Sequence, residues 1–214
     1  MKTEDWVSML ATGVDAIDPK RTARRHFLAI TGGLLAALAF TGGILRFNPA
    51  LSNRMLLEPM FWVREAYCAA LALLGFVAVT RLARPGIRLG LAPAGVVTVV
   101  VVMWTFAATV LLRAPAQNRS HLLFGTSAAV CPFLIALVAV PLFIAILWVL
   151  RDLAPTRLRL AGAAAGFAAG SLGALVYSLH CPELAAPFFG TWYLLGMLIP
   201  TSLGAWLGPR LMRW

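Results

Sequence analysis

Six apolar runs, each long enough to cross a lipid bilayer as an α-helix, occupy most of this chain. A helical span needs about 20 mainly apolar residues, because the hydrocarbon core of a bilayer is ~30 Å thick. The predicted spans are 27–45, 61–80, 91–112, 122–150, 160–179 and 187–207. The fourth run is the longest, and we expect it to be tilted, kinked near Pro132 or Pro141, or partly outside the bilayer.

The composition agrees with a chain that is soluble only in lipid. Hydrophobic residues make up 61% of the chain, charged residues 12%, and the mean hydropathy is +0.85. A soluble fold could not cover its surface with so few polar side chains. The first run is too long for the apolar part of a signal peptide, so we expect it to be retained as the first span. The sequence therefore predicts an all-α membrane protein, a six-helix transmembrane bundle (27–214) with a short cytoplasmic N-terminal amphipathic segment (1–26).

The basic residues predict the orientation of the bundle. If the N-terminus is inside, 13 of the 18 Lys and Arg residues lie in inner segments, as the positive-inside rule requires. These residues are Lys2, Lys20, Arg21, Arg24, Arg25, Arg81, Arg84, Arg88, Arg151, Arg157, Arg159, Arg210 and Arg213. We therefore expect both termini to be cytoplasmic. Membrane lipids explain the net charge of +10, and no direct nucleic-acid partner is expected.

The N-terminal segment carries an apolar stripe at helical spacing. We expect a helix that begins near Thr3 and ends by Asp18, before Pro19. Such a stripe needs a surface, which can be the bilayer, the bundle or the groove of a partner. No basic residue lies between Asp5 and Lys20, and this favours a protein partner over a membrane surface. The predicted partner-binding residues are Trp6, Val7, Leu10, Val14 and Ile17.

Small residues form one face of the fifth predicted span. Gly162, Gly166 and Gly170 recur at every fourth position, so another helix can approach them backbone to backbone. Packing inside the bundle is the favoured use, and a homodimer is the alternative. Near the outer end of the second span, Arg64 and Glu65 are interpreted as an interfacial pair, with Arg64 reaching toward water.

All three cysteines are predicted to lie toward the outer side, where thiols can be oxidised. Cys68 is interpreted as a buried small residue. Cys181 lies in the turn "HCPE", where Pro182 ends the helix and the polar groups are expected to face water. His180 can lower the pKa of the neighbouring thiol, and Cys with His is also a soft-metal ligand set.

A redox or thiol-reactive pair of Cys131 and Cys181 is the favoured interpretation of these residues. A metal site is the alternative, with Cys131, Cys181, His180 and His121 as candidate ligands, and no cofactor is expected. A small transporter or metal-handling permease would show polar groups inside the spans, and these are mainly Ala, Leu, Val, Gly and Phe. A thiol-disulfide enzyme would show a Cys-x-x-Cys motif, which is missing, so no enzymatic activity is expected.

The C-terminal part of the chain resembles a known family. It reads "APTRLRLAGAAAGFAAGSLGALVYSLHCPE" and then "FFGTWYLLGMLIPTSLGAWLGPRLMRW". This is similar to the NrsF-like bacterial membrane anti-sigma factors, which negatively regulate an extracytoplasmic-function sigma factor. The most specific positions lie in 154–214, at Pro155-Thr156-Arg157, "LHCPE", Trp192-Tyr193 and "LGPRLMRW".

This resemblance implies a function. A six-span inner-membrane protein would hold the sigma factor through its N-terminal segment, away from core RNA polymerase, until an outer stress signal releases it. Two cysteines are associated with the stress response in this family, and Cys131 and Cys181 occupy the matching positions. Cys68 lies outside the family pattern.

Overall fold

The computed structural model describes residues 3–11, 19–51, 55–84 and 86–213. Six of the helical segments in these ranges are long and apolar enough to cross a membrane. The predicted fold class, an all-α membrane protein with six spanning helices, is confirmed. The helices are α1 (Thr3–Ala11), α2 (Pro19–Phe40), α3 (Pro59–Leu82), α4 (Ala92–Arg113), α5 (Ala116–Phe124), α6 (Cys131–Asp152), α7 (Leu158–Ser178), α8 (Ala186–Phe188) and α9 (Leu194–Leu211).

Short irregular helices extend or join these elements. A π-helix, Thr41–Leu45, continues α2, and a second one, Phe189–Tyr193, joins α8 to α9. Two 3₁₀ turns, Pro49–Leu51 and Met55–Leu57, precede α3.

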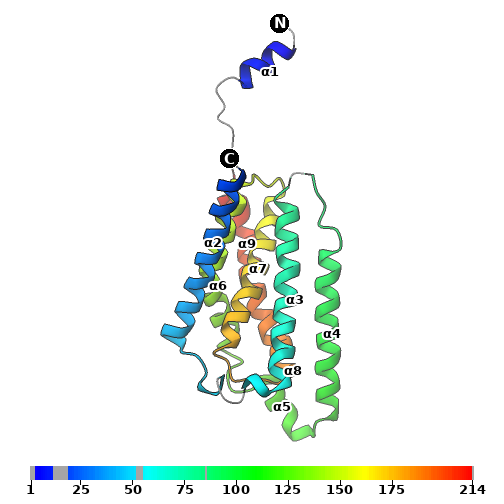
Figure 1. Cartoon of the computed structure of the whole chain (residues 1–214). Helices are drawn as coiled ribbons and strands as arrows, with labels where there is room; N and C mark the ends of the chain where they lie inside the picture. The colour runs from blue at the N-terminus through cyan, green and yellow to red at the C-terminus, as the bar shows by residue number, and fades with distance from the viewer. Residues whose placement is uncertain (1–2, 12–18, 52–54, 85, 214) are drawn as a thin grey trace.

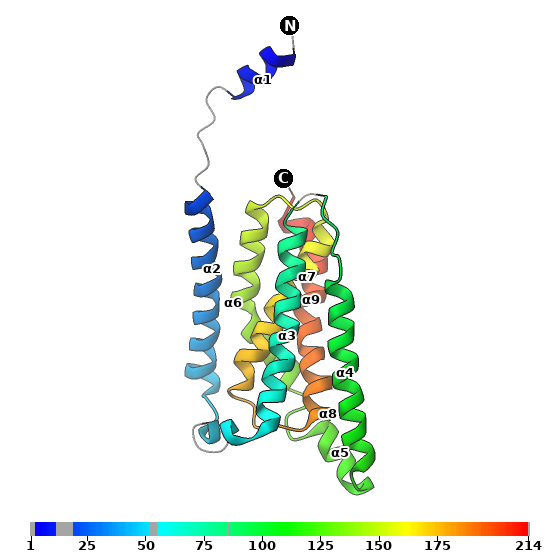
Figure 2. The same ribbon diagram turned by 45° about the vertical axis from the view of Figure 1, so that its right-hand side comes forward.

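The bundle is built around α7, the most buried of the six spanning helices. It packs against α9, α3 and α6, while α2 packs on α6 at one edge and α4 on α3 at the other (Figures 1 and 2). The start of α2 and the end of α9 lie at the same end of the bundle (Figure 1). We call it the basic end, because the arginines of 81–88, 151–159 and 210–213 lie there, and the opposite end the cysteine end.

Glycines on α7 allow the closest helix contact in the bundle. A side chain at Gly162 would meet the backbone of Gly204, and one at Gly166 would meet the carbonyl of Pro200, both on α9. A Cβ atom at Gly170 would lie 2.9 Å from the Cα atom of Met197. Without side chains between them, the two backbones touch, and dispersion contacts hold the helices together. In this structure the small-residue face of α7 therefore lies against α9 of the same chain.

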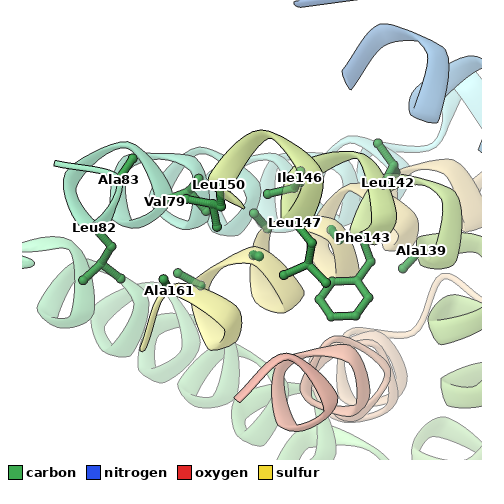
Figure 3. Packing of buried hydrophobic residues seen from close by; sticks show 14 of the residues in the cluster. Val79, Leu82, Ala83, Ala139, Leu142, Phe143, Ile146, Leu147, Leu150 and Ala161 are labelled. Atoms are coloured by element: carbon green, nitrogen blue, oxygen red, sulfur yellow. The ribbon is translucent and has the colours of Figure 1, made fainter. Parts of the chain in front are cut away.

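Larger apolar side chains fill the core between α3, α6 and α7 toward the basic end (Figure 3). Leu142, Ile146 and Leu150 recur at every fourth residue of α6, so they share one face of that helix. They belong to the same buried cluster as Val79 of α3 and Ala161 of α7.

The fourth predicted span is shorter in the structure than the apolar run suggests. The helix begins at Cys131 rather than at residue 122, because α5 ends at Phe124 and Gly125 follows it with a positive φ of 51°. A positive φ suits glycine and ends a helix. Pro132 then stands in the first turn of α6, where its missing N–H costs nothing. For the run 122–150, the sequence predicts a span that is tilted, kinked or partly outside the bilayer. The third alternative describes the structure best, because residues 122–130 precede the spanning helix.

Candidate functional site

The fold brings Cys131 and Cys181 together at the cysteine end. Cys131 is the first residue of α6, and Cys181 follows the end of α7. Both are free thiols with no exposed surface, and both belong to one buried cluster with Tyr177 and Tyr193. Cys68 of α3 lies in the same cluster and is fully buried, as predicted.

The prediction that the polar groups of the "HCPE" turn face water is wrong for Cys181. Pro182 is exposed, and His180 and Glu183 are partly exposed, but the Cys181 side chain is turned into the bundle. The cause is the way the turn is held, because its backbone carbonyls are bound from inside the bundle by α3.

The two thiols affect one another electrostatically. A side-chain hydrogen bond with Cys131 lowers the pKa of the Cys181 thiol below its usual value; burial opposes this shift and the backbone N–H of Glu183 supports it. A lowered pKa favours the thiolate, which is the form that reacts with an oxidant or binds a metal.

His180 does not cause this shift, which corrects the sequence-based argument. Its Nδ1 lies 2.7 Å from the carbonyl oxygen of Arg46, and a carbonyl can only accept, so Nδ1 carries a hydrogen and donates it. The imidazole thus ties the turn to the segment after α2. A second bond, from the Asn48 backbone N–H to the Leu179 carbonyl at 3.0 Å, supports the same tie.

Arg64 holds the cysteine turn from inside. This α3 residue is fully buried, and its guanidinium donates to three backbone carbonyls. The distances are 2.8 Å to Ser178, 3.1 Å to Cys181 and 2.9 Å to Glu183. The interpretation of Arg64 as an interfacial residue that reaches toward water is therefore wrong.

Arg64 is buried because the C-terminal end of α7 needs hydrogen-bond donors. The last carbonyl groups of a helix have no partner within the helix and carry partial negative charge. Arg64 supplies hydrogen-bond donors and a positive charge to that end, so a residue of α3 caps α7. Its Nε also lies 3.4 Å from a carboxylate oxygen of Glu65, which further compensates the buried charge.

Glu183 fastens the turn on its other side. Its carboxylate accepts hydrogen bonds from the backbone N–H and the hydroxyl of Thr126, both at 2.8 Å. Gly125 makes room for it, since a Cβ atom there would lie 2.7 Å from a carboxylate oxygen. The turn that carries Cys181 is thus tied to the α5–α6 connection as well as to α3.

The four candidate metal ligands do not gather. His121 is exposed on α5 and His180 bonds to Arg46. In the part of the chain that the structure describes, no group of three or more His, Cys, Asp or Glu side chains could hold a metal ion. The arrangement is a buried pair of thiols, which can bind a soft metal as two ligands or lose two electrons and two protons to form a disulfide.

The predicted partner-binding residues lie far along the chain from this site. Trp6 and Val7 are on α1, with 50% and 62% of their surface exposed. Leu10 also lies in α1, while Val14 and Ile17 fall outside the described residues. Residues 19–26, assigned to the N-terminal segment from the sequence, belong to α2 in the structure.

The sequence-based interpretation placed Arg64 at the membrane interface rather than in the core, and it missed the bond between Glu183 and Thr126. A signal for Arg64 was present, because an ionisable residue inside an apolar span is expected to be paired and buried. No comparable signal marked Thr126, which meets Glu183 only because the fold places α5 beside the turn.

Comparisons with known proteins cover almost the whole chain. Residues 10–214 match the family model NrsF, described as "Negative regulator of sigma F". The chain is 47% identical over 214 residues to the "Probable anti-sigma-F factor NrsF" of Azospira oryzae and 37% identical over 224 residues to the "Anti-sigma-F factor NrsF" of Caulobacter vibrioides. Each comparison covers 100% of both proteins. No solved structure matches the chain.

Proposed function

We propose that this chain, which belongs to the NrsF family of negative regulators of sigma F, is a membrane-bound anti-sigma factor. The observation that carries this proposal is its full-length likeness to two anti-sigma-F factors. The resemblance seen in residues 154–214 is thereby confirmed and extends over most of the chain. By holding a sigma factor at the membrane, such a protein would keep it from RNA polymerase.

The N-terminal segment is the proposed docking site for a sigma factor of the extracytoplasmic-function class. Support comes from α1, whose Trp6, Val7 and Met9 are at least half exposed. Apolar anchors at helical spacing are how a helix binds a partner's groove. With Leu10, Val14 and Ile17, these residues would form the apolar face that enters the groove.

The proposed location is the bacterial inner membrane, with both termini in the cytoplasm. The even number of spans supports a shared side for both termini, and the start of α2 and the end of α9 lie at the same end of the bundle (Figure 1). It places the basic end inside, as the positive-inside rule requires, and the cysteine end outside.

Cys131 and Cys181 are the proposed sensor of an outer stress signal. An oxidant would take two electrons and two protons from the thiols and leave a disulfide, whereas a soft metal ion would bind both sulfurs and displace their protons. Support comes from their shared buried cluster and from the lowered pKa of Cys181. Either reaction would change the packing of the turn, because the thiols lie in a close-packed core.

A pull-down of the full chain from solubilised membranes tests the anti-sigma function and the docking site separately. We expect a sigma factor to copurify with the natural protein. Trp6→Ala with Leu10→Ala should weaken its retention about thirtyfold or more, because a central aromatic anchor contributes ~2 kcal/mol. Ser8→Ala is the matched control, since Ser8 lies on the opposite side of α1 from Trp6.

The outcomes separate the two claims. If no sigma factor copurifies with the natural chain, the anti-sigma function is wrong. If it is retained equally by the double variant and by Ser8→Ala, the function stands, but the sigma factor binds elsewhere than α1.

A further inference from the structure

A hollow of about 730 Å³ opens on the side of α9 at the basic end. Three arginines line it: Arg159 from the first turn of α7, and Arg210 and Arg213 from the C-terminal end of the chain. Ser202, Ala205, Trp206 and Pro209 complete the lining. All three arginines are exposed. The site is therefore a basic pocket that can be reached from outside the bundle.

The arginines lack acidic partners among the described residues. In that part of the chain, the ion pairs join Asp152 to Arg25 and His26, and Glu65 to Arg64. Arg210 is held by Trp206, since its Nη1 donates to the Trp206 carbonyl at 3.1 Å and its guanidinium lies 4.5 Å from the ring centroid. Three like charges around one hollow favour an anion, and arginine matches the oxygens of a phosphate group.

An apolar groove continues from this pocket along α9. It has a volume of about 380 Å³, and Ser202 lines both hollows. Its other lining residues are Leu195, Leu198, Ile199 and Leu203. From Arg210 back to Leu195 the helix rises about 22 Å. This exceeds the thickness of one leaflet, which is half of the ~30 Å hydrocarbon core.

We infer that this face of α9 binds one anionic phospholipid. The phosphate would lie among Arg159, Arg210 and Arg213, and an acyl chain would follow the apolar groove. Trp206 lines the pocket about one helical turn from Arg210, and tryptophan is enriched at the depth of membrane headgroups. An acidic protein segment could satisfy the arginines but could not enter the bilayer beside Leu198, so the apolar continuation favours a lipid. This proposal differs from the general attraction of basic loops to membranes, because it assigns one lipid molecule to one defined pocket and groove.

Native mass spectrometry of the delipidated full chain in detergent tests the site. We expect phosphatidylglycerol to bind the natural protein in preference to phosphatidylcholine. Arg159→Gln with Arg210→Gln should weaken phosphatidylglycerol binding about tenfold or more. Arg84→Gln with Arg88→Gln is the matched control, because it removes the same charge from the same end of the bundle outside the hollow. The altered side chains are exposed, so both variants should fold, and melting curves check this.

Three results would overturn the inference. Equal weakening in the two double variants would mean that only overall charge attracts the lipid. Displacement of the lipid by glycerol phosphate at similar concentration would mean that the groove contributes nothing and the pocket binds a free anion. A photo-crosslinking amino acid in place of Trp206 that captures protein instead of phospholipid in membranes would make this face a protein-docking surface.

Discussion

Replacing Arg64 by methionine tests whether the buried guanidinium holds the cysteine turn closed. Methionine fills a similar volume but donates no hydrogen bond and carries no charge. The variant leaves the carbonyls of Ser178, Cys181 and Glu183 without the donors that now lie 2.8–3.1 Å away. It also removes the positive charge from the C-terminal end of α7.

The expected loss of stability follows from these three bonds. At a net contribution of about 1 kcal/mol each, they stabilise the closed turn by about 3 kcal/mol. A similar cost, ~3–5 kcal/mol, is typical when one partner of a buried charged interaction is removed. Since 1.4 kcal/mol changes an equilibrium tenfold, the turn should open about 100-fold more often. Arg64→Lys keeps the positive charge but loses the forked donors of the guanidinium. The turn should therefore open more often in Arg64→Lys than in the natural protein, but less often than in Arg64→Met.

The rate at which a membrane-impermeant maleimide labels Cys181 measures this opening. The membranes are kept under reducing conditions beforehand so that the thiols stay free, and mass spectrometry identifies the labelled peptide. Arg64→Met should raise the labelling rate toward that of an open thiol. Arg119→Met is the matched control, because Arg119 also caps a helix, with bonds to the carbonyls of Leu112 and Ala114 at 3.3 and 3.1 Å, but it is exposed. Water replaces an exposed donor, so labelling should stay unchanged. If both variants label Cys181 at the natural rate, Arg64 does not hold the turn.

Three further predictions concern helix packing, the thiol pair and topology. Gly166→Leu should lower the melting temperature and the membrane level of the protein, since overpacking costs about 1–3 kcal/mol, whereas Gly32→Leu, which meets nothing within 4 Å, should not. Cys131→Ala should move the pH midpoint of Cys181 alkylation upward, toward the ~8.5 of an ordinary thiol, because it removes the main cause of the lowered pKa; an unchanged pH profile would contradict this cause. A reporter fused to the C-terminus should report cytoplasm and one at Gln117 the outer side; the same side for both would refute the topology.

The number and order of the spanning helices could be predicted because hydropathy depends on local sequence alone. Apolar content could not, however, locate the break between α5 and α6, since Leu122, Leu123 and Phe124 join the apolar run to the span across only three polar or small residues, Gly125, Thr126 and Ser127. The relevant signals were conformational: Gly125 just after one helix and Pro132 just inside the next. Reading the end signals together with hydropathy would have placed the start of α6 correctly.

The partners of the site residues depend on tertiary structure. The sequence singled out both cysteines, but the distance between α6 and the α7–α8 turn is set by the packing of the whole bundle. Arg64 and Cys181 are separated by 117 residues, and no periodicity in α3 or α7 shows that Arg64 meets the turn after α7. The error about Arg64 came from weighing its distance to the membrane surface without asking which helix end needed a cap.

A packed route joins the proposed sensor to the proposed docking segment. Cys131 begins α6, and Asp152 ends it at the opposite end of the bundle. There the Asp152 carboxylate lies 3.8 Å from Arg25 and 3.5 Å from His26 of α2, the helix that follows the N-terminal segment. Midway, α6 and α2 touch closely, since a Cβ atom at Gly33 would lie 3.1 Å from Ala145. Pro141 lies inside α6 between these points, so a displacement of Cys131 would reach α2 through the packed contact at Gly33 and Ala145 only if α6 does not bend at this proline.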